Sequence, residues 1–172
     1  QAQVELAGIF DYFYENVEDA SYIVGWMDAF GSGKSLGRGD VHRADYLKPG
    51  EDANPSQSLR LENQYPPENL FGLVPKSIMW LGMRPFMNNV GTRFVNMGKY
   101  YAGHLTGGAN YLQSHAAFHF LLDYVPNWKK SYGPGGLIQY QPFIPKENAQ
   151  NAFADILRVC QYHGQPNYLT VF

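Results

Sequence analysis

Ser21-Tyr-Ile-Val-Gly-Trp-Met27 is predicted to form a β-strand, because its β-branched and aromatic residues favour that conformation. A glycine-rich connection follows it and leads to a second predicted strand near residues 40–47. Before it, apolar residues recur at helical spacing and predict an amphipathic helix; they are Leu6, Ile9, Phe10, Phe13 and Val17. A helix followed by two adjacent strands indicates an α+β fold at this end of the chain.

The remaining segments extend the same mixture of helices and strands. They are expected as a long loop at 48–69, helical pieces at 75–103 broken by Pro85, Gly91 and Gly98, strands at 111–124 and 137–144, a helix at 146–163 that Pro145 starts, and a last strand from Tyr168. This order predicts an α+β fold with a mostly antiparallel β-sheet and with helices covering one face of the sheet. The length of 172 residues fits a single domain spanning residues 1–172.

Composition excludes several classes of protein. A net charge of −2 argues against a polybasic protein that binds nucleic acid. The single cysteine, Cys160, excludes a disulfide scaffold and a zinc site built from cysteines. Aromatic residues make up 16% of the chain, as much as all charged residues together, and Tyr and Trp need partners for their polar groups. This composition favours an aromatic-lined pocket or a domain interface over a purely aliphatic core.

Gly31-Ser-Gly-Lys-Ser35 looks like the end of a phosphate-binding loop. The full motif needs a glycine five positions before Gly33, where this chain has Asp28. It also needs a helix directly after the loop, and Leu36-Gly-Arg-Gly39 is a poor start for one. We therefore do not expect this loop to bind a nucleotide.

Polar side chains share one face of each of the two strands predicted at 111–124 and 137–144. His115 and His119 lie on one face of the first strand, and Gln139 and Gln141 lie on one face of the second. Uncharged hydrogen-bonding groups beside apolar residues suit a half-buried pocket, but a solvated outer face of a sheet is also polar. Both interpretations stay open at this point. Two histidines without a third ligand do not predict a metal site.

Three motifs in order along the chain resemble FAD-linked oxidoreductases of the vanillyl-alcohol oxidase superfamily, with the decaprenylphosphoryl-ribose oxidase branch as the nearest likeness. The most specific is Leu122-Asp-Tyr-Val-Pro-Asn-Trp-Lys-Lys-Ser-Tyr-Gly-Pro-Gly-Gly-Leu-Ile-Gln-Tyr-Gln-Pro-Phe-Ile-Pro145. Trp26-Met-Asp28, followed by Leu36-Gly-Arg38, resembles an early signature of the cap domain of that branch. Tyr168-Leu-Thr-Val-Phe172 resembles the strand that leads into its substrate-site lysine. The likeness is weakest over residues 48–110.

The resemblance implies that this chain is the substrate-binding cap domain of a longer flavoenzyme, whose FAD-binding domain lies upstream. The chain opens at a glutamine without Met and stops inside an apolar run, which also suggests a fragment. By resemblance, Gln139, Gln141 and His119 face the substrate, with His119 where the branch carries a tyrosine, and Trp26 matches a pocket-side tryptophan. No residue of this stretch is expected to bind the cofactor or a metal. The ordinary pKa of a histidine, about 6.5, suits proton transfer near neutral pH. His119 is therefore expected to be either a catalytic base or a hydrogen-bonding pocket residue.

The predicted function is therefore oxidation of an alcohol group of a sugar or sugar-lipid substrate by hydride transfer to FAD, with the isolated fragment inactive. The predicted partners are a small-molecule substrate and the upstream FAD-binding domain. We predict a cytoplasmic protein whose only membrane contact is peripheral. The alternatives are a cap of a sterol-type FAD-dependent reductase, a stand-alone module that binds a small ligand without catalysis, and a protein-interaction domain that uses residues 79–101 as a contact patch.

Overall fold

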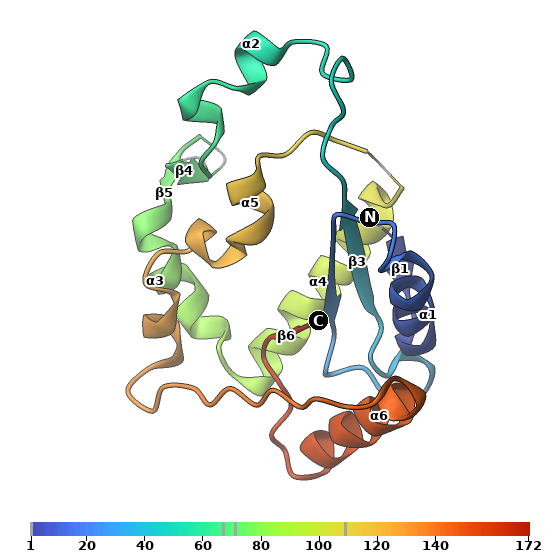
Figure 1. Cartoon of the computed structure of the whole chain (residues 1–172). Helices are drawn as coiled ribbons and strands as arrows, with labels where there is room; N and C mark the ends of the chain where they lie inside the picture. The colour runs from blue at the N-terminus through green and yellow to red at the C-terminus, as the bar shows by residue number, and fades with distance from the viewer. Residues whose placement is uncertain (1, 67, 71, 109) are drawn as a thin grey trace. The chain divides into compact units, whose positions relative to one another are not determined.

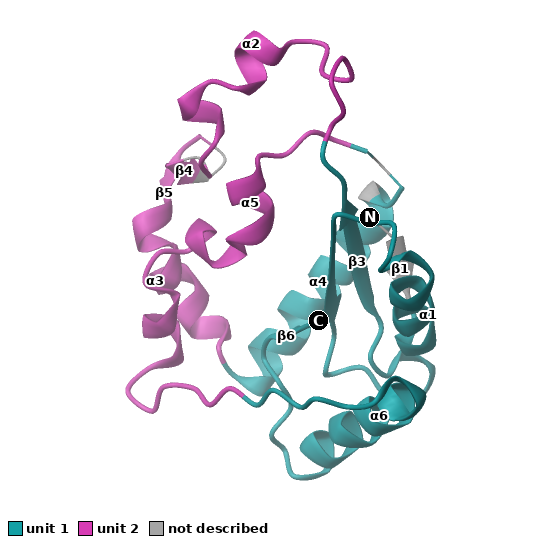
Figure 2. Ribbon diagram, in the orientation of Figure 1, with its two compact units in different colours: residues 1–46, 88–110, 140–172 teal, residues 47–87, 111–139 magenta. Residues whose placement is uncertain are grey.

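The structure is a computed structural model that describes residues 2–66, 68–70, 72–108 and 110–172 (Figure 1). The chain divides into two compact units, each assembled from separate stretches of sequence (Figure 2). Unit 1 contains residues 1–46, 88–110 and 140–172, and unit 2 contains residues 47–87 and 111–139. Helices and an antiparallel sheet make the fold α+β, as predicted.

A four-stranded sheet in the order β1-β3-β2-β6 forms the centre of unit 1. Its strands are β1 (Ala2–Val4), β2 (Tyr22–Met27), β3 (Gly39–Ala44) and β6 (Thr170–Val171). All three pairings are antiparallel, which confirms the predicted strand direction. The last strand predicted from Tyr168 is present as β6, and it pairs with the end of β2 at Trp26 and Met27.

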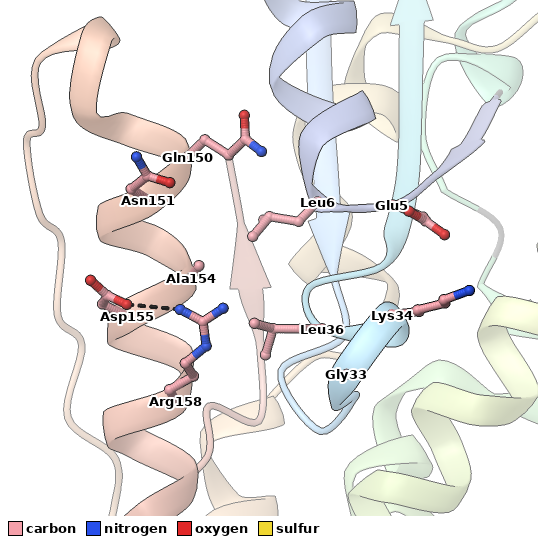
Figure 3. A pocket seen from close by; sticks show the side chains of 10 residues that line it. All are labelled: Glu5, Leu6, Gly33, Lys34, Leu36, Gln150, Asn151, Ala154, Asp155 and Arg158. Atoms are coloured by element: carbon pink, nitrogen blue, oxygen red, sulfur yellow. Dashed lines mark hydrogen bonds and ion pairs between the residues drawn. The ribbon is translucent and has the colours of Figure 1, made fainter.

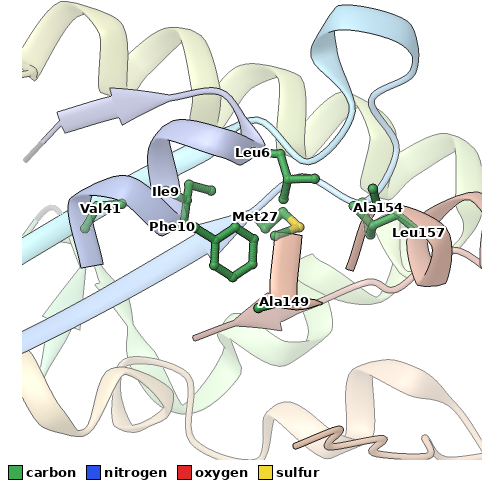
Figure 4. Close-up of a cluster of buried hydrophobic side chains, with 9 residues drawn as sticks. Leu6, Ile9, Phe10, Met27, Val41, Ala149, Ala154 and Leu157 are labelled. Carbon is green, nitrogen blue, oxygen red and sulfur yellow. The ribbon is translucent and has the colours of Figure 1, made fainter. Parts of the chain in front are cut away.

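Two helices pack on one face of this sheet and form the hydrophobic core with it. These are α1 (Leu6–Asn16) and α6 (Lys146–Tyr162), and both agree with the predicted helices. Figure 4 shows the buried side chains of this core: Leu6, Ile9, Phe10, Met27, Val41, Ala149, Ala154 and Leu157, with Ala29 as a further member. The C-terminal Phe172 packs against them through its ring contacts with Phe10 and Phe153.

A third helix of unit 1, α4 (Asn89–Thr106), packs against β1 and β3. Its Lys99 and Asn96 contact Trp26 and Asp28, on the side of the sheet away from the core. Helices therefore cover both faces of the sheet, and the prediction of one covered face was wrong. α4 also runs without a break through Gly91 and Gly98, so the predicted interruptions at these two glycines are absent. The Asn88 side chain caps the first turn by accepting a hydrogen bond from the Gly91 N–H.

The loop that joins β2 to β3 lies against α1 and α6. Gln161 of α6 donates hydrogen bonds to the carbonyl oxygens of Ala29 and Gly31 at 2.7 and 2.8 Å. Gly37 has a φ of 64°, and a Cβ there would lie 2.8 Å from Leu6 Cδ1. The position therefore requires glycine for its backbone conformation and for the close approach of α1.

We expect Gly37→Ala to lower the free energy of unfolding by about 1–3 kcal/mol, because alanine is strained at positive φ and would displace a core leucine. Gly98→Ala is the matched control: Gly98 lies inside α4, and a Cβ there meets no atom within 4 Å. That variant should raise stability by about 0.5–1 kcal/mol. Chemical denaturation measures both values, and a Gly37→Ala protein as stable as the parent would contradict the packing described here.

Unit 2 consists of short helices and one small hairpin. Its elements are α2 (Pro55–Ser58), η2 (Leu61–Asn63), β4 (Asn69–Leu70), β5 (Val74–Pro75), η3 (Lys76–Ile78), α3 (Met79–Met83), η4 (Arg84–Phe86), α5 (His115–His119), η5 (Leu121–Tyr124) and η6 (Trp128–Tyr132). The hydroxyl of Ser131 in η6 donates a hydrogen bond to the Trp80 carbonyl of α3, which ties these two elements together. Pro85 falls in η4, so the predicted interruption of the helical region at this proline is present.

The strand predicted at 111–124 was wrong, because α5 and η5 occupy this segment. Ser114 starts α5 by accepting a hydrogen bond from the Ala117 N–H. The following alanines favour a helix, and the segment contains no β-branched residue to favour a strand.

The strand predicted at 137–144 was also wrong, because these residues join no sheet. Pro142 has no N–H for a strand ladder and restricts the backbone of the residue before it. The segment leads into α6, whose cap is Pro145.

Among the described residues, no helix combines the length and the apolar character needed to cross a bilayer.

Candidate functional site

Trp26 lies on the face of the sheet that α4 covers, and we call its surroundings the Trp26 face. Side chains alternate along β2, so Met27 points into the core while Trp26 points to the opposite side. In the register of β2 and β3, Trp26 pairs with Asp40 and Val24 pairs with His42. One tryptophan, one carboxylate and one imidazole therefore share this face.

Asp40 is fully buried at the middle of the Trp26 face. Neither carboxylate oxygen has a hydrogen-bond partner among the described residues. A buried carboxylate without hydrogen bonds is costly for stability, and most proteins avoid one. Such a group is expected where function, rather than stability, requires the charge.

Lys99 of α4 brings a positive charge to the same place. Its Nζ lies 4.0 Å from the centre of the Trp26 ring, in a cation–π contact. Although the residue as a whole is exposed, burial lowers the pKa of Lys99 to about 8, and the Asp40 charge opposes this shift. An amine with a pKa near 8 can accept a proton close to neutral pH, which an ordinary lysine cannot.

His42 completes the Trp26 face. It is half-buried, and burial lowers the pKa of its imidazole below the ordinary value of 6.5. His42 is therefore neutral at pH 7 and offers one hydrogen-bond donor and one acceptor.

A buried ion pair supports the Trp26 face from the adjoining loop. Asp28 accepts hydrogen bonds from Arg38 Nε at 3.1 Å, from the Phe30 N–H at 3.0 Å and from Asn96 Nδ2 at 3.1 Å. The Arg38 guanidinium lies 4.2 Å from the centre of the Tyr100 ring of α4. The aspartate of Trp26-Met-Asp28 and the arginine of Leu36-Gly-Arg38 thus bind each other and connect the loop to α4.

The predicted site residues are distributed over both units. Trp26 is nearly buried within the cluster just described. Gln141 belongs to unit 1 and is exposed, in the segment that joins no sheet. His119 and Gln139 belong to unit 2; both are exposed, and the His119 ring lies 4.4 Å from that of His115 within α5. The shared strand faces that suggested a common pocket for these residues are absent, so their roles stay predictions that rest on the resemblance alone.

The sequence reasoning missed Asp40, His42 and Lys99. A signal was available for the first two, because residues 40 and 42 alternate with the core residue Val41 in a predicted strand. Lys99 carried no such signal, because only the packing of α4 brings it to Trp26.

Unit 1 also contains a cavity of about 560 Å³ on the core side of the sheet, beside α6. Figure 3 shows Gln150 and Arg158 reaching from α6 toward Leu6 and Leu36, and Arg158 is paired with Asp155 at 2.8 Å. Lys34 points away from α6 in this view.

Residues 33–35 form a short 3-10 turn, and the chain then continues into β3 without an α-helix, as predicted. The loop therefore lacks the geometry of a phosphate-binding loop.

No group of three or more His, Cys, Asp or Glu side chains in the described part of the chain is arranged to hold a metal ion.

The chain shares sequence similarity with curated proteins, and in one of them the similarity extends along almost the whole chain. It is the decaprenylphosphoryl-beta-D-ribose oxidase of Mycolicibacterium smegmatis, which is 26% identical over 164 residues, or 93% of this chain. This chain is a distant relative of that oxidase. The present chain spans about a third of the length of that oxidase. No family model matches the chain, and no solved structure matches it.

Proposed function

We propose that this chain is the substrate-binding cap domain of an FAD-dependent oxidoreductase of the vanillyl-alcohol oxidase type. The proposed reaction oxidises an alcohol group of a sugar or a sugar linked to a lipid. The relative's name states that it oxidises a ribose carried on decaprenyl phosphate, and this supports the substrate class. The observation that carries the proposal is the contact of the Lys99 ammonium with Trp26 beside the buried, unpaired Asp40.

The residues of this chain would bind the alcohol and remove its proton. Lys99, with its lowered pKa, is the proposed proton acceptor, and Asp40 sets the affinity of Lys99 for that proton through its charge. Neutral His42 would hydrogen-bond a sugar hydroxyl without placing a second charge in the site. Trp26 would hold the Lys99 ammonium in place while the amine is charged.

We assign FAD binding to another part of the intact protein, upstream of this chain. The glycine-rich turn at residues 31–35 does not have the form of a loop that holds a phosphate group, so these residues do not fit the cofactor. The flavin supplies the electron acceptor for alcohol oxidation when bound. His119, Gln139 and Gln141 remain proposed substrate contacts on the strength of the resemblance.

The visible absorption spectrum of the intact protein tests this proposal. We expect a bound flavin whose absorption band bleaches when a sugar alcohol donor is added without oxygen. An intact protein without flavin would overturn the oxidoreductase assignment and would favour a stand-alone binding module.

A further inference from the structure

The side of α4 that packs on the sheet is polar. Thr92 and Asn96 are buried there, whereas Phe94 and Leu105, at other positions around the helix, are exposed. α4 therefore has the reverse of the usual pattern, in which the apolar face of a helix packs inward. Buried polar side chains are normally hydrogen-bonded, so the partners of this side show what holds α4 on the sheet.

Asn96 and Tyr100, which lie one turn apart on α4, contact the same ion pair. Asn96 Nδ2 donates a hydrogen bond to Asp28 Oδ1 at 3.1 Å, and Arg38 Nε donates one to Asp28 Oδ2 at 3.1 Å. The Arg38 guanidinium in turn lies 4.2 Å from the centre of the Tyr100 ring. Residues four positions apart on a helix lie on the same side of it. The Asp28–Arg38 pair thus holds one turn of α4 at two points.

Lys99 belongs to the turn that these two contacts hold. It follows Asn96 by three residues and directly precedes Tyr100, and its Nζ lies 4.0 Å from the centre of the Trp26 ring. Trp26 stands two residues before Asp28, so the ring and the carboxylate that anchors the turn belong to one short stretch of chain. A lysine side chain is long and flexible, and it keeps one position more readily when its backbone is fixed.

We infer that Asn96 and Tyr100 are positioning residues that hold the Lys99 ammonium on the Trp26 ring through the ion pair of the adjoining loop. Both act through Lys99, and neither is proposed to touch the substrate. The role of Lys99 as a proton acceptor rests on the proposed function, whereas the placement of its ammonium does not.

Loss of either contact should raise the pKa of Lys99. Burial is the larger influence on this pKa and lowers it to about 8, while the charge of Asp40 is the smaller influence and raises it. A turn released from the loop would admit water to the amine, so the larger influence would weaken. The other titratable groups around the amine are His42 of β3 and the Asp28–Arg38 pair, and β1 has no titratable side chain. Replacing a neutral asparagine or tyrosine leaves all these groups in place.

NMR of the lysine side chains in the intact protein measures this pKa, with the Lys99 resonance identified by its absence in Lys99→Met. We expect a midpoint at about pH 8 in the parent protein and a midpoint about one unit higher in Asn96→Ala and in Tyr100→Leu. Below this midpoint the donor should reduce the flavin about tenfold more slowly in both variants, because one unit of pKa changes the neutral fraction tenfold. Tyr100 is only half-buried, so its variant provides the test even where Asn96→Ala fails to fold.

Asn89→Ala is the matched control, because Asn89 also lies on α4 and its amide donates a hydrogen bond at 3.0 Å, to the Gly164 carbonyl oxygen. Its Lys99 midpoint should equal that of the parent protein. A Lys99 that titrates like an ordinary lysine in the parent protein, or that keeps the parental midpoint in both Asn96→Ala and Tyr100→Leu, would overturn the inference. A raised midpoint without slower flavin reduction would support the positioning role and would remove Lys99 from the proposed chemistry. The two failures are therefore distinct.

Discussion

Replacing Asp28 with alanine should lower the free energy of unfolding by about 3–5 kcal/mol, measured by chemical denaturation. The Asp28 side chain is 3% exposed and accepts hydrogen bonds from three groups on the loop and on α4. Its removal would leave the Arg38 guanidinium without its carboxylate in a site that is only 17% exposed. A buried charge that loses its partner is among the largest single-residue losses of stability.

Asp155→Ala provides the matched control, because it removes an aspartate from an Asp–Arg pair on the surface of α6. The side chains of Arg158 and Asp155 are 63% and 72% exposed, and their contact is shorter than that of Arg38 and Asp28. Water solvates both partners of an exposed pair, so we expect a loss of at most about 1 kcal/mol. If the two variants lose equal stability, the Asp28 pair does not hold the loop to α4 as the structure indicates. Asp28→Asn keeps the shape of the side chain and should fall between the two.

Replacing Lys99 with methionine should slow turnover of the intact flavoenzyme by about 100-fold or more, the usual contribution of a positioned acid or base. Methionine retains an unbranched apolar stem but has no amine to accept the proton of the alcohol. Flavin content should remain that of the parent protein, because this chain is not expected to bind the cofactor. Steady-state kinetics with the donor that bleaches the parent flavin measures the effect.

Lys34→Met separates the specific role of Lys99 from a general effect of lost positive charge. Lys34 lies at the cavity on the core side of the sheet and is exposed. Turnover of that variant should equal that of the parent protein. A Lys99→Met enzyme with parental turnover would remove Lys99 from the proposed chemistry.

Local sequence signals predicted α1, β2, β3, α6 and β6 of unit 1, but they missed β1. The helical spacing from Leu6 to Phe13 and the strand residues before Met27 gave α1 and β2, because both elements bury an apolar face against the same core. The predictions for 111–124 and 137–144 failed for local reasons. The Ser114 side chain caps a helix in the first segment, and Pro142 in the second segment has no N–H to give to a strand ladder.

The candidate site could be predicted only in part. Trp26 was predicted from the resemblance, and the structure surrounds it with charged groups. Lys99 lies far from Trp26 in the sequence, and its contact depends on a helix that turns its polar side inward. Such a helix contradicts the rule by which apolar residues are assigned to the core, so sequence patterns place its buried face wrongly.

The pH dependence of flavin reduction by the donor, measured in the intact parent protein and in Asp40→Asn, tests whether Lys99 accepts the proton of the alcohol. If neutral Lys99 accepts the proton, the rate rises with pH and levels off above about pH 8, where the amine has lost its own proton. The Asp40 charge raises the pKa of Lys99, so Asp40→Asn should move the midpoint of the rise to lower pH. A midpoint that stays unchanged in Asp40→Asn, or a rate without a rise near pH 8, would contradict the assignment of the Trp26 face as the substrate site.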